Sequence, residues 1–387
     1  MLQVFTNANF RMMYRTKWYF IVISMFSILV SAWAMVTRGF NLGIDFAGGT
    51  AVQVKFLESP RVEELRAALE TAGLGDVNIQ KIGDTDDNEV LIRVEQQQTA
   101  AEGVAGGEGG EVSTRVLEAL KTPEERAATQ AGKIDLNMAS RSTLQEWLGT
   151  RLPNASEVAE AFVRYRTEHG GLVAQPSEIA SIPGVTPEAA SLLTSQSIVG
   201  SFALRSVEFV GPTAGRELLQ DTAWLILLSI LGILIYVWVR FHKWMWGVTS
   251  VIALMHDVFI AAGMISLTGK EFSLTVVAAL LTILGYSIND TIVVFDRIRE
   301  NLRLYREHEF EDIVNASVNQ TLSRTMLTSL SLLMALVALL MFGGDKLNPM
   351  SFCLLVGVGF GTYSSVFVAA ALLVVAYRRF GLKYVKA

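Results

Sequence analysis

GYSINDTIVVFDRIREN, residues 285–301, ends an apolar run that starts near Phe272 and is long enough to cross a lipid bilayer. It contains polar and charged side chains, whose burial in the hydrocarbon of a membrane costs free energy. Within membrane helices, such side chains either fix helices to one another or mark a route for ions. The stretch therefore indicates a membrane protein with a polar interior. Its polar side chains are Tyr286, Ser287, Asn289, Asp290, Asp296 and Arg297.

The composition agrees with a membrane protein. Of the 387 residues, 51% are hydrophobic and only 18% are charged, whereas soluble domains usually carry about 25% charged residues. A helix needs roughly 20 apolar residues to cross the ~30 Å hydrocarbon core. We therefore predict an α-helical polytopic membrane protein with six transmembrane helices. The apolar blocks that predict them are Tyr19–Val36, Thr222–Val239, Trp244–Leu267, Phe272–Phe295, Thr325–Phe342 and Met350–Tyr377.

The first block also has features of a cleaved signal peptide, since Arg11, Arg15 and Lys17 precede an apolar run. That run is long for a signal peptide, and five more blocks follow it. We therefore expect an uncleaved first helix.

Lys and Arg residues predict the orientation, because they are enriched in short cytoplasmic segments. With a cytoplasmic N-terminus, the inner segments carry fourteen of them, whereas the short outer loops carry only Lys270 and Lys346. We expect both termini in the cytoplasm and a large periplasmic or extracellular domain between the first two helices. The predicted divisions are 1–37 (N-terminus and first helix), 38–129 and 201–221 (two parts of the outer domain), 130–200 (an insert) and 222–387 (five helices, with a cytoplasmic loop at 296–324).

The outer domain alternates short strands and helices. The order strand, helix, strand, strand, helix, strand predicts an α+β ferredoxin-like domain. We expect a Ser59 cap at the start of its first helix, and a flexible Gly-rich joint at 103–111. The predicted strands are 50–57, 76–82, 89–95 and 202–211, and the predicted helices are 59–73 and 111–121.

The segment 130–200 is predicted to be a small all-α insert. Helices are expected at 132–147 and 158–171, and Ile182-Pro183-Gly184-Val185 is typical of a hairpin between two short helices. The insert resembles the helix-hairpin-helix module of the ComEA type, whose hairpin amides bind nucleic-acid phosphates. Thr186 stands where that module has a second Gly. We therefore favour a structural or protein-binding insert over DNA binding.

Several motifs occur together in the order that is typical of one known family. LGIDFAGGT (42–50) follows the first helix, VGPTAGREL (210–218) leads into the second, and MHD (255–257) lies in the third. GYSINDTIVVFDRIREN ends the fourth, QTLSRTMLTS (320–329) opens the fifth and FGGDKL (342–347) closes it. Together they resemble the SecF family, the smaller subunit of the SecDF complex that assists bacterial protein export. The motif positions are Gly43, Asp45, Phe46, Gly48, Gly49, Gly211, Pro212, Asp296, Arg324 and Thr325.

The resemblance implies one six-helix half of an RND-type transporter that assists protein translocation across the inner membrane by using the proton-motive force. It implies SecD, the SecYEG translocon, a translocating preprotein and membrane lipid as partners, with YajC as a further candidate and no nucleic acid. The resemblance also implies that ATP hydrolysis belongs to SecA, and this agrees with the lack of a Walker-type loop in the chain. We expect a translocase accessory subunit rather than an enzyme, and no cofactor. His169, His242, His256 and His308 have no metal-ligand spacing, and Cys353 is the only cysteine.

Two other functions remain open. The first is half of an RND-type proton-driven exporter of small or lipidic substrates, which would share the topology. The second is a membrane-anchored protein for DNA binding or uptake that acts through the insert. The coupling ion is also open, because an alkaline or marine host could couple sodium in place of the proton.

Asp257 is the candidate proton carrier. It lies close to the middle of its predicted helix, where an unpaired carboxylate costs several kcal/mol. Burial favours the neutral acid, which can take up and release a proton within the membrane. The alternative is a structural Asp that is hydrogen-bonded to a neighbouring helix.

A polar pathway is expected to lead from Asp257 to the cytoplasm. By helix rise, Asp257 is level with residues 282–285, and Asn289 and Asp290 have candidate partners in Thr321, Arg324, Thr325 and Thr328. Arg297 is either a gate or one more cytoplasmic charge. The predicted pathway consists of Asp257, Tyr286, Ser287, Asn289, Asp290 and Arg297.

The last block carries small residues at a spacing of four: Gly357, Gly361 and Ser365. Such a face favours close helix packing, either within this half or with SecD. Ser364 and Ser365 are expected near the depth of Asp257. Asp45, Gly48 and Gly49 are expected to shape a tight turn rather than to bind a ligand.

Overall fold

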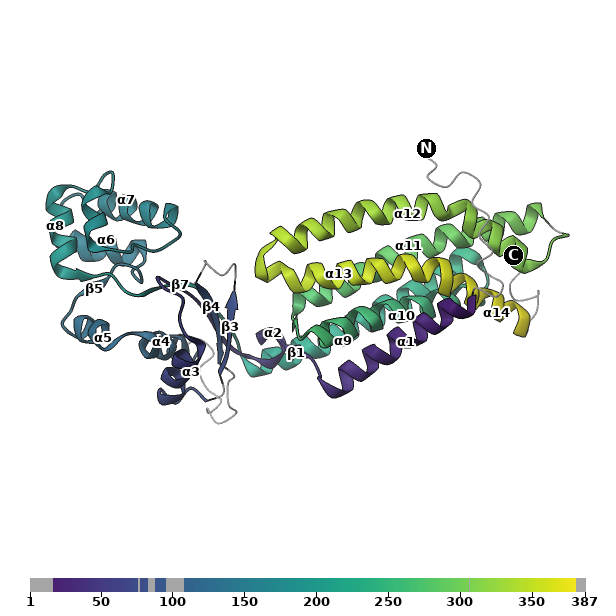
Figure 1. The fold of residues 1–387 in the computed structure, drawn as a ribbon, viewed down its shortest axis with the longest axis horizontal. Helices are drawn as coiled ribbons and strands as arrows, with labels where there is room; N and C mark the ends of the chain where they lie inside the picture. The colour runs from purple at the N-terminus through teal and green to yellow at the C-terminus, as the bar shows by residue number, and fades with distance from the viewer. Residues whose placement is uncertain (1–16, 76, 83–87, 95–107, 306, 381–387) are drawn as a thin grey trace. The chain divides into compact units, whose positions relative to one another are not determined.

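The computed structural model describes residues 17–75, 77–82, 88–94, 108–305 and 307–380. The chain forms two compact units, Met1–Asp45 with Glu217–Ala387, and Phe46–Arg216. The first unit is a helix bundle, and the second contains a four-stranded sheet and short helices (Figure 1).

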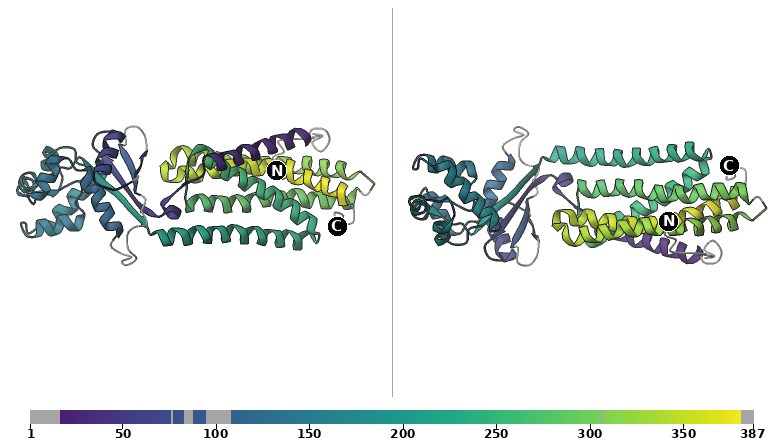
Figure 2. Two further views of the ribbon diagram at one scale, coloured as in Figure 1. Left: turned by 90° about the horizontal axis from the view of Figure 1, so that it is seen from below. Right: turned by 90° about the horizontal axis from the view of Figure 1, so that it is seen from above.

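Six helices are long and apolar enough to cross a membrane, which confirms the predicted fold class. In the most apolar 18-residue stretch of each helix, 56% of the residues are buried for α10, α11 and the last helix. The buried share is 17% for α1 and α12 and 11% for α9. The bundle therefore has three inner and three outer helices, which run side by side (Figure 2). They are α1 (Lys17–Thr37), α9 (Pro212–Phe241), α10 (Trp244–Thr268), α11 (Leu274–Leu304), α12 (Phe310–Phe342) and the continuous segment α13 (Gly344–Ser364), η2 (Ser365–Ala369) and α14 (Ala370–Phe380).

Most of the segment 296–324, which the sequence predicts to be a cytoplasmic loop, is helical. α11 continues to Leu304 and α12 begins at Phe310. Ile298 and Leu302 on α11 and Val314 and Val318 on α12 recur at a spacing of four and are buried in one apolar cluster. Such amphipathic spacing extends both helices beyond the continuously apolar blocks.

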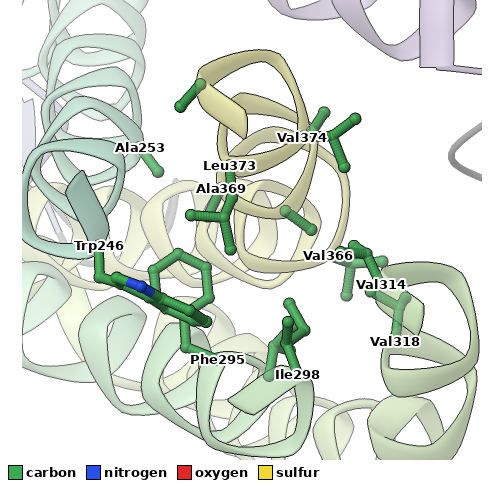
Figure 3. Close-up of a cluster of buried hydrophobic side chains, with 14 of the residues drawn as sticks. Trp246, Ala253, Phe295, Ile298, Val314, Val318, Val366, Ala369, Leu373 and Val374 are labelled. Carbon is green, nitrogen blue, oxygen red and sulfur yellow. The ribbon is translucent and has the colours of Figure 1, made fainter. Parts of the chain in front are cut away.

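The apolar cluster joins the inner helices near their shared end. Figure 3 shows Trp246 of α10 and Phe295 of α11 beside Ala369 and Leu373 of the last helical segment. The rings of Trp246 and Phe295 meet edge to face, with their centroids 5.0 Å apart. This packing fixes α10, α11 and α14 relative to one another.

The small face of α13 lies against α11. A Cβ atom added at Gly357 would overlap the side chain of Ile283, and one added at Gly361 would lie 3.2 Å from Cβ of Ser287. The face therefore packs within this chain, and it brings the backbone of α13 next to the polar residues of α11.

Gly357→Ala is expected to destabilise the bundle by about 1–3 kcal/mol, because the added methyl group overpacks the contact with Ile283. The measurement is thermal unfolding of the purified protein in detergent. Gly359→Ala is the matched control, since nothing lies within 4 Å of its added Cβ. Equal melting temperatures for the two variants would contradict the close packing.

In the second unit, four strands form one antiparallel sheet. Their order is β3-β4-β2-β7. α3 (Val62–Thr71) and α4 (Glu108–Leu120) share its apolar core, where Leu69 and Val116 are buried with Val52 and Ile92. The strands are β2 (Gly49–Phe56), β3 (Val77–Ile82), β4 (Glu89–Val94) and β7 (Phe202–Val210).

Two details of this unit differ from the prediction. Arg61, not Ser59, occupies the N-cap position of α3, and Ser59 instead accepts a hydrogen bond from Lys81. α4 begins at Glu108, so the end of the predicted joint is helical, and residues 103–107 lie outside the described ranges.

The insert is mostly helical, with its own apolar core. Leu144, Leu148, Phe162, Ile179 and Leu193 are buried in that core. The elements from α4 to β7 are α5 (Pro123–Gln130), β5 (Ile134–Asp135), α6 (Arg141–Gly149), α7 (Ala155–Glu168), η1 (Pro176–Ser181), α8 (Pro187–Gln196) and β6 (Ser197–Ile198).

The helix predicted at 132–147 begins later, at Arg141, after the Ser140 cap. The preceding residues form a strand and a turn, because the buried side chain of Asn137 bonds to Val173 and Gly200. Sequence reasoning also missed α5, which has little apolar periodicity. Its signal is the capping box of Thr122 and Glu125.

Candidate functional site

Asp257 lies near the middle of α10 with an exposed fraction of 0%. Ser287 of α11 and Ser364 of α13 each donate a hydrogen bond to its Oδ2, at 2.6 Å. Nδ1 of His256 lies 2.9 Å from its Oδ1. The carboxyl group therefore has partners on both oxygens and joins the three inner helices. Ser365, the other candidate, donates to the carbonyl oxygen of Thr362 instead.

The depth of Asp257 differs slightly from the expectation. Its partner on α11 is Ser287, not a residue of 282–285. One reason is that α11 begins at Leu274, two residues after the start of the apolar block.

A second polar cluster lies beside the first, on α11, α12 and α13. Ser329 accepts hydrogen bonds from Tyr286 at 3.2 Å and from Thr362 at 2.7 Å. Its own Oγ lies 3.5 Å from Oδ2 of Asp290, and Arg324 attracts the Asp290 carboxylate electrostatically. Tyr286 and Asp290 thus turn toward the bundle interior, next to the Asp257 cluster.

Asn289 does not belong to either cluster. Its side chain is exposed, because a step of about 100° per residue turns it away from buried Asp290. Of the partners expected for Asp290, Arg324 is the one that interacts with it in the described part of the chain. Thr321 and Thr328 donate to carbonyl groups of their own helix, and the hydroxyl of buried Thr325 has no partner within the described residues.

Arg297 and Asp296 lie apart from Asp257 and form ion pairs of their own. Arg297 donates to Gln320 at 2.5 Å and to Glu300 at 2.6 Å. Asp296 accepts from Arg240 at 2.6 Å, which ties the end of α9 to α11.

The glycine motifs after α1 and at the start of α9 also have structural roles. Gly48 has φ +73°, and its added Cβ would lie 3.0 Å from Cα of Pro212. A Cβ at Gly215 would lie 3.0 Å from the carbonyl oxygen of Phe46. Asp45 does more than shape a turn, because its carboxylate accepts from the backbone amide of Leu274 at 2.9 Å and so caps α11.

Sequence reasoning missed three polar residues of the clusters: His256, Ser329 and Thr362. The adjacency of His256 to Asp257 is a signal for the first. Ser329 follows Thr325 at a spacing of four on α12, which is a weak signal for a shared face.

Comparison with known proteins identifies the family. The model described as "Protein export membrane protein SecD/SecF, C-terminal" matches residues 191–379, and "SecD/SecF GG Motif" matches residues 33–56. The chain is 38% identical to the protein translocase subunit SecF of Koribacter versatilis, over 96% of this chain and 93% of that one. The chain belongs to the SecF family. A second SecF, from Desulfurispirillum indicum, is 36% identical over 93% of this chain and 90% of its own length.

Solved SecDF structures agree with membership of the SecF family. The crystal structure of SecDF from Thermus thermophilus matches with a TM-score of 0.64 and 31% identity, over 96% of this chain. SecDF in the super-membrane-facing form matches with a TM-score of 0.54 and 30% identity, over 98%. The chain spans 39% and 40% of those two SecDF chains. Because the chain belongs to the SecF family and has six helices that are long and apolar enough to cross a membrane, it is a multi-pass membrane subunit of protein translocation.

Ser329→Ala is expected to destabilise the bundle by about 1–2 kcal/mol, because it removes the hydroxyl that joins α11, α12 and α13. Thermal unfolding in detergent measures the effect. Ser331→Ala is the control two residues away, since Ser331 is exposed and donates to the carbonyl oxygen of Thr328 on its own helix. An equal effect of both substitutions would contradict the linking role of Ser329.

Proposed function

We propose that this SecF subunit assists protein translocation by coupling it to the proton-motive force, with Asp257 as the proton carrier. The observation that carries the proposal is a fully buried carboxyl group in a membrane-spanning helix, with Ser287, Ser364 and His256 around it. Hydroxyl groups suit this role, because they donate to an ionised carboxylate and accept from a neutral carboxylic acid.

The energy available to such a carrier is sufficient for coupling. One proton that crosses ~150 mV releases about 3.5 kcal/mol from the electrical potential. A free energy of that size shifts a two-state equilibrium by a few hundred-fold. A conformational change of the bundle is therefore within reach of one proton per cycle.

The proposed route to the cytoplasm passes along α11. Ser287 contacts Asp257, and Tyr286 and Asp290 lie in the neighbouring cluster with Ser329. Arg297 stands at the end of this route as a gate that is held by Glu300 and Gln320. Asn289, which is exposed, is left out of the proposed route.

The proposed partner within the membrane is SecD, which the matched SecDF structures name together with SecF. Exposed polar groups on α11 support a protein partner at this surface, because Thr282 and Asn289 would otherwise face lipid. Among the described residues, Asn289 makes no side-chain hydrogen bond. The SecYEG translocon, YajC and a translocating preprotein are proposed as further partners.

The proposed role of the insert is structural or protein-binding. Its separate apolar core and the left-handed turn at Gly184 (φ +95°) support a compact module with a hairpin. Residues 130–200 contain five Lys and Arg against seven Asp and Glu, a balance that does not favour nucleic-acid phosphates. DNA binding through the insert and the export of small or lipidic substrates are the competing functions.

The proposed orientation places both termini in the cytoplasm and residues 38–221 outside. Cysteines introduced at exposed Ser195 and at exposed His308, in a Cys353→Ala background, should then react oppositely with a membrane-impermeant maleimide. Position 195 should be labelled in spheroplasts, and position 308 only after lysis. Labelling of position 308 without lysis would contradict this topology.

Asp257→Asn should fold, insert and pair with SecD, because the amide keeps the shape and the hydrogen-bonding capacity of the carboxyl group. It should abolish the gain in preprotein translocation that an imposed proton gradient gives, while ATP-driven translocation by SecA continues. Asp257→Glu should retain part of the gain. The measurement is translocation into membrane vesicles with and without the gradient. A full response from Asp257→Asn would reject the proton-carrier role.

A further inference from the structure

The hydroxyl group of Ser364 lies within hydrogen-bonding distance of two acceptors. Oδ2 of Asp257 is 2.6 Å away, and the carbonyl oxygen of Gly361 is 3.1 Å away. A serine hydroxyl carries one hydrogen, so it donates fully to only one acceptor at a time. The state of Asp257 decides which acceptor receives it.

His256 indicates which oxygen of Asp257 carries the exchangeable proton. Nε2 of His256 is buried and has no hydrogen-bond partner within the described residues. A buried N–H without an acceptor is rarer and costlier than an unused lone pair, so a neutral His256 carries its proton on Nδ1. Nδ1 then donates to Oδ1 of Asp257, at 2.9 Å. The proton of neutral Asp257 is therefore left to Oδ2, which faces Ser287 and Ser364.

The two serines differ in what they can do when Oδ2 is protonated. Oδ2 must then donate to one hydroxyl, and that hydroxyl must turn its own hydrogen to another acceptor. Ser364 has the carbonyl oxygen of Gly361 available. For the hydroxyl group of Ser287, Oδ2 of Asp257 is the one hydrogen-bond acceptor among the described residues. The change in hydrogen bonding that follows protonation of Oδ2 is therefore relayed by Ser364, which has a second acceptor, and not by Ser287.

The acceptor that Ser364 turns to lies at a change of helix type. The carbonyl oxygen of Gly361 also accepts the backbone amide of Ser365, and Ser365 begins the π-helical segment Ser365–Ala369. A hydroxyl that donates to a carbonyl of the preceding turn bends a helix. A shift of the Ser364 hydroxyl toward this carbonyl is therefore expected to alter the backbone geometry where α13 passes into the π-helical segment.

We propose that Ser364 is the positioning residue through which the protonation state of Asp257 sets the bend at Ser365–Ala369. This inference rests on the proposed role of Asp257 as a proton carrier, and it adds the step from the proton to the backbone. The incoming proton forms an O–H bond at Oδ2 of Asp257, and Ser364 exchanges only hydrogen bonds. With Asp257 ionised, Ser364 donates to Oδ2; with Asp257 neutral, Oδ2 donates to Ser364, and Ser364 donates to Gly361.

The test measures the bend and the protonation separately in the full chain paired with SecD in lipid nanodiscs. Spin labels at Leu330→Cys and Val375→Cys, both exposed positions, report the distance between α12 and α14 in a Cys353→Ala background. Infrared absorption of the protonated carboxyl group reports Asp257. In the otherwise unchanged protein, the distance should shift over the pH range in which the infrared band appears. Asp257→Asn should keep the low-pH distance throughout, because its amide also donates to Ser364.

Ser364→Ala should lose the pH-dependent shift in distance while the infrared band of Asp257 still appears. Ser287→Ala is the matched control, since it also removes one donor to Oδ2, and it should keep the shift. Ser364→Thr, which retains the hydroxyl group, should keep it too, and Ser364→Gly, which lacks the hydroxyl group, should lose it. The last two variants decide the question if Ser364→Ala does not insert.

A normal shift in Ser364→Ala would overturn the inference, and so would an equal loss in Ser364→Ala and Ser287→Ala, which would indicate a general effect of a missing donor. Translocation assays separate this failure from failure of the proposed function. A full response of Asp257→Asn to the proton gradient would overturn both the proposed function and this inference. A lost response in Asp257→Asn, together with a normal shift in Ser364→Ala, removes only the inference.

Discussion

A carboxyl group at the centre of a membrane-spanning helix must receive its hydrogen bonds from neighbouring helices, and the arrangement of this bundle follows from that requirement. Asp257 lies on α10, and its donors Ser287 and Ser364 lie on α11 and α13. Serine side chains are short, so the three backbones must approach closely. Gly361 lets α13 approach Ser287, and Gly357 lets it approach Ile283. The glycines and the carboxyl group are therefore parts of one packing solution.

The large apolar cluster complements this polar contact. Trp246, Phe295 and Leu373 fill the space between the same helices, and burial of such side chains provides stability that a polar contact in the membrane does not. The polar centre can therefore rearrange its hydrogen bonds while the packing around it persists. α1, α9 and α12 bury much less of their surface, which leaves their apolar sides for lipid or for another protein.

The sequence predicts those features that depend on long, uniform patterns. Six apolar blocks locate the six helices, and the central position of Asp257 follows from the ends of its block. Features that depend on the direction of one side chain were not predictable. Asn289 and Asp290 are neighbours in the sequence, yet one is exposed and the other buried, and only the packed bundle decides between them. α11 and α12 extend past their apolar blocks because four-residue spacing, rather than continuous hydrophobicity, holds them together. The start of α6 was misplaced for a similar reason: Asn137 holds a turn through contacts with Val173 and Gly200, which are distant in sequence.

Asp45 has a consequence for the biogenesis of the bundle. Its carboxylate caps α11 at Leu274, a residue made 229 positions later in the chain. The neighbouring backbone pairs, Asn41 with Glu271 and Leu42 with Phe272, span a similar interval. During synthesis, the end of α1 therefore stays without these partners until α9 and α10 have left the ribosome and α11 has begun to follow. Closure of this end of the bundle is therefore a late event of membrane insertion. It requires that the first and fourth helices have entered the membrane in opposite directions, because the end of α1 contacts the start of α11.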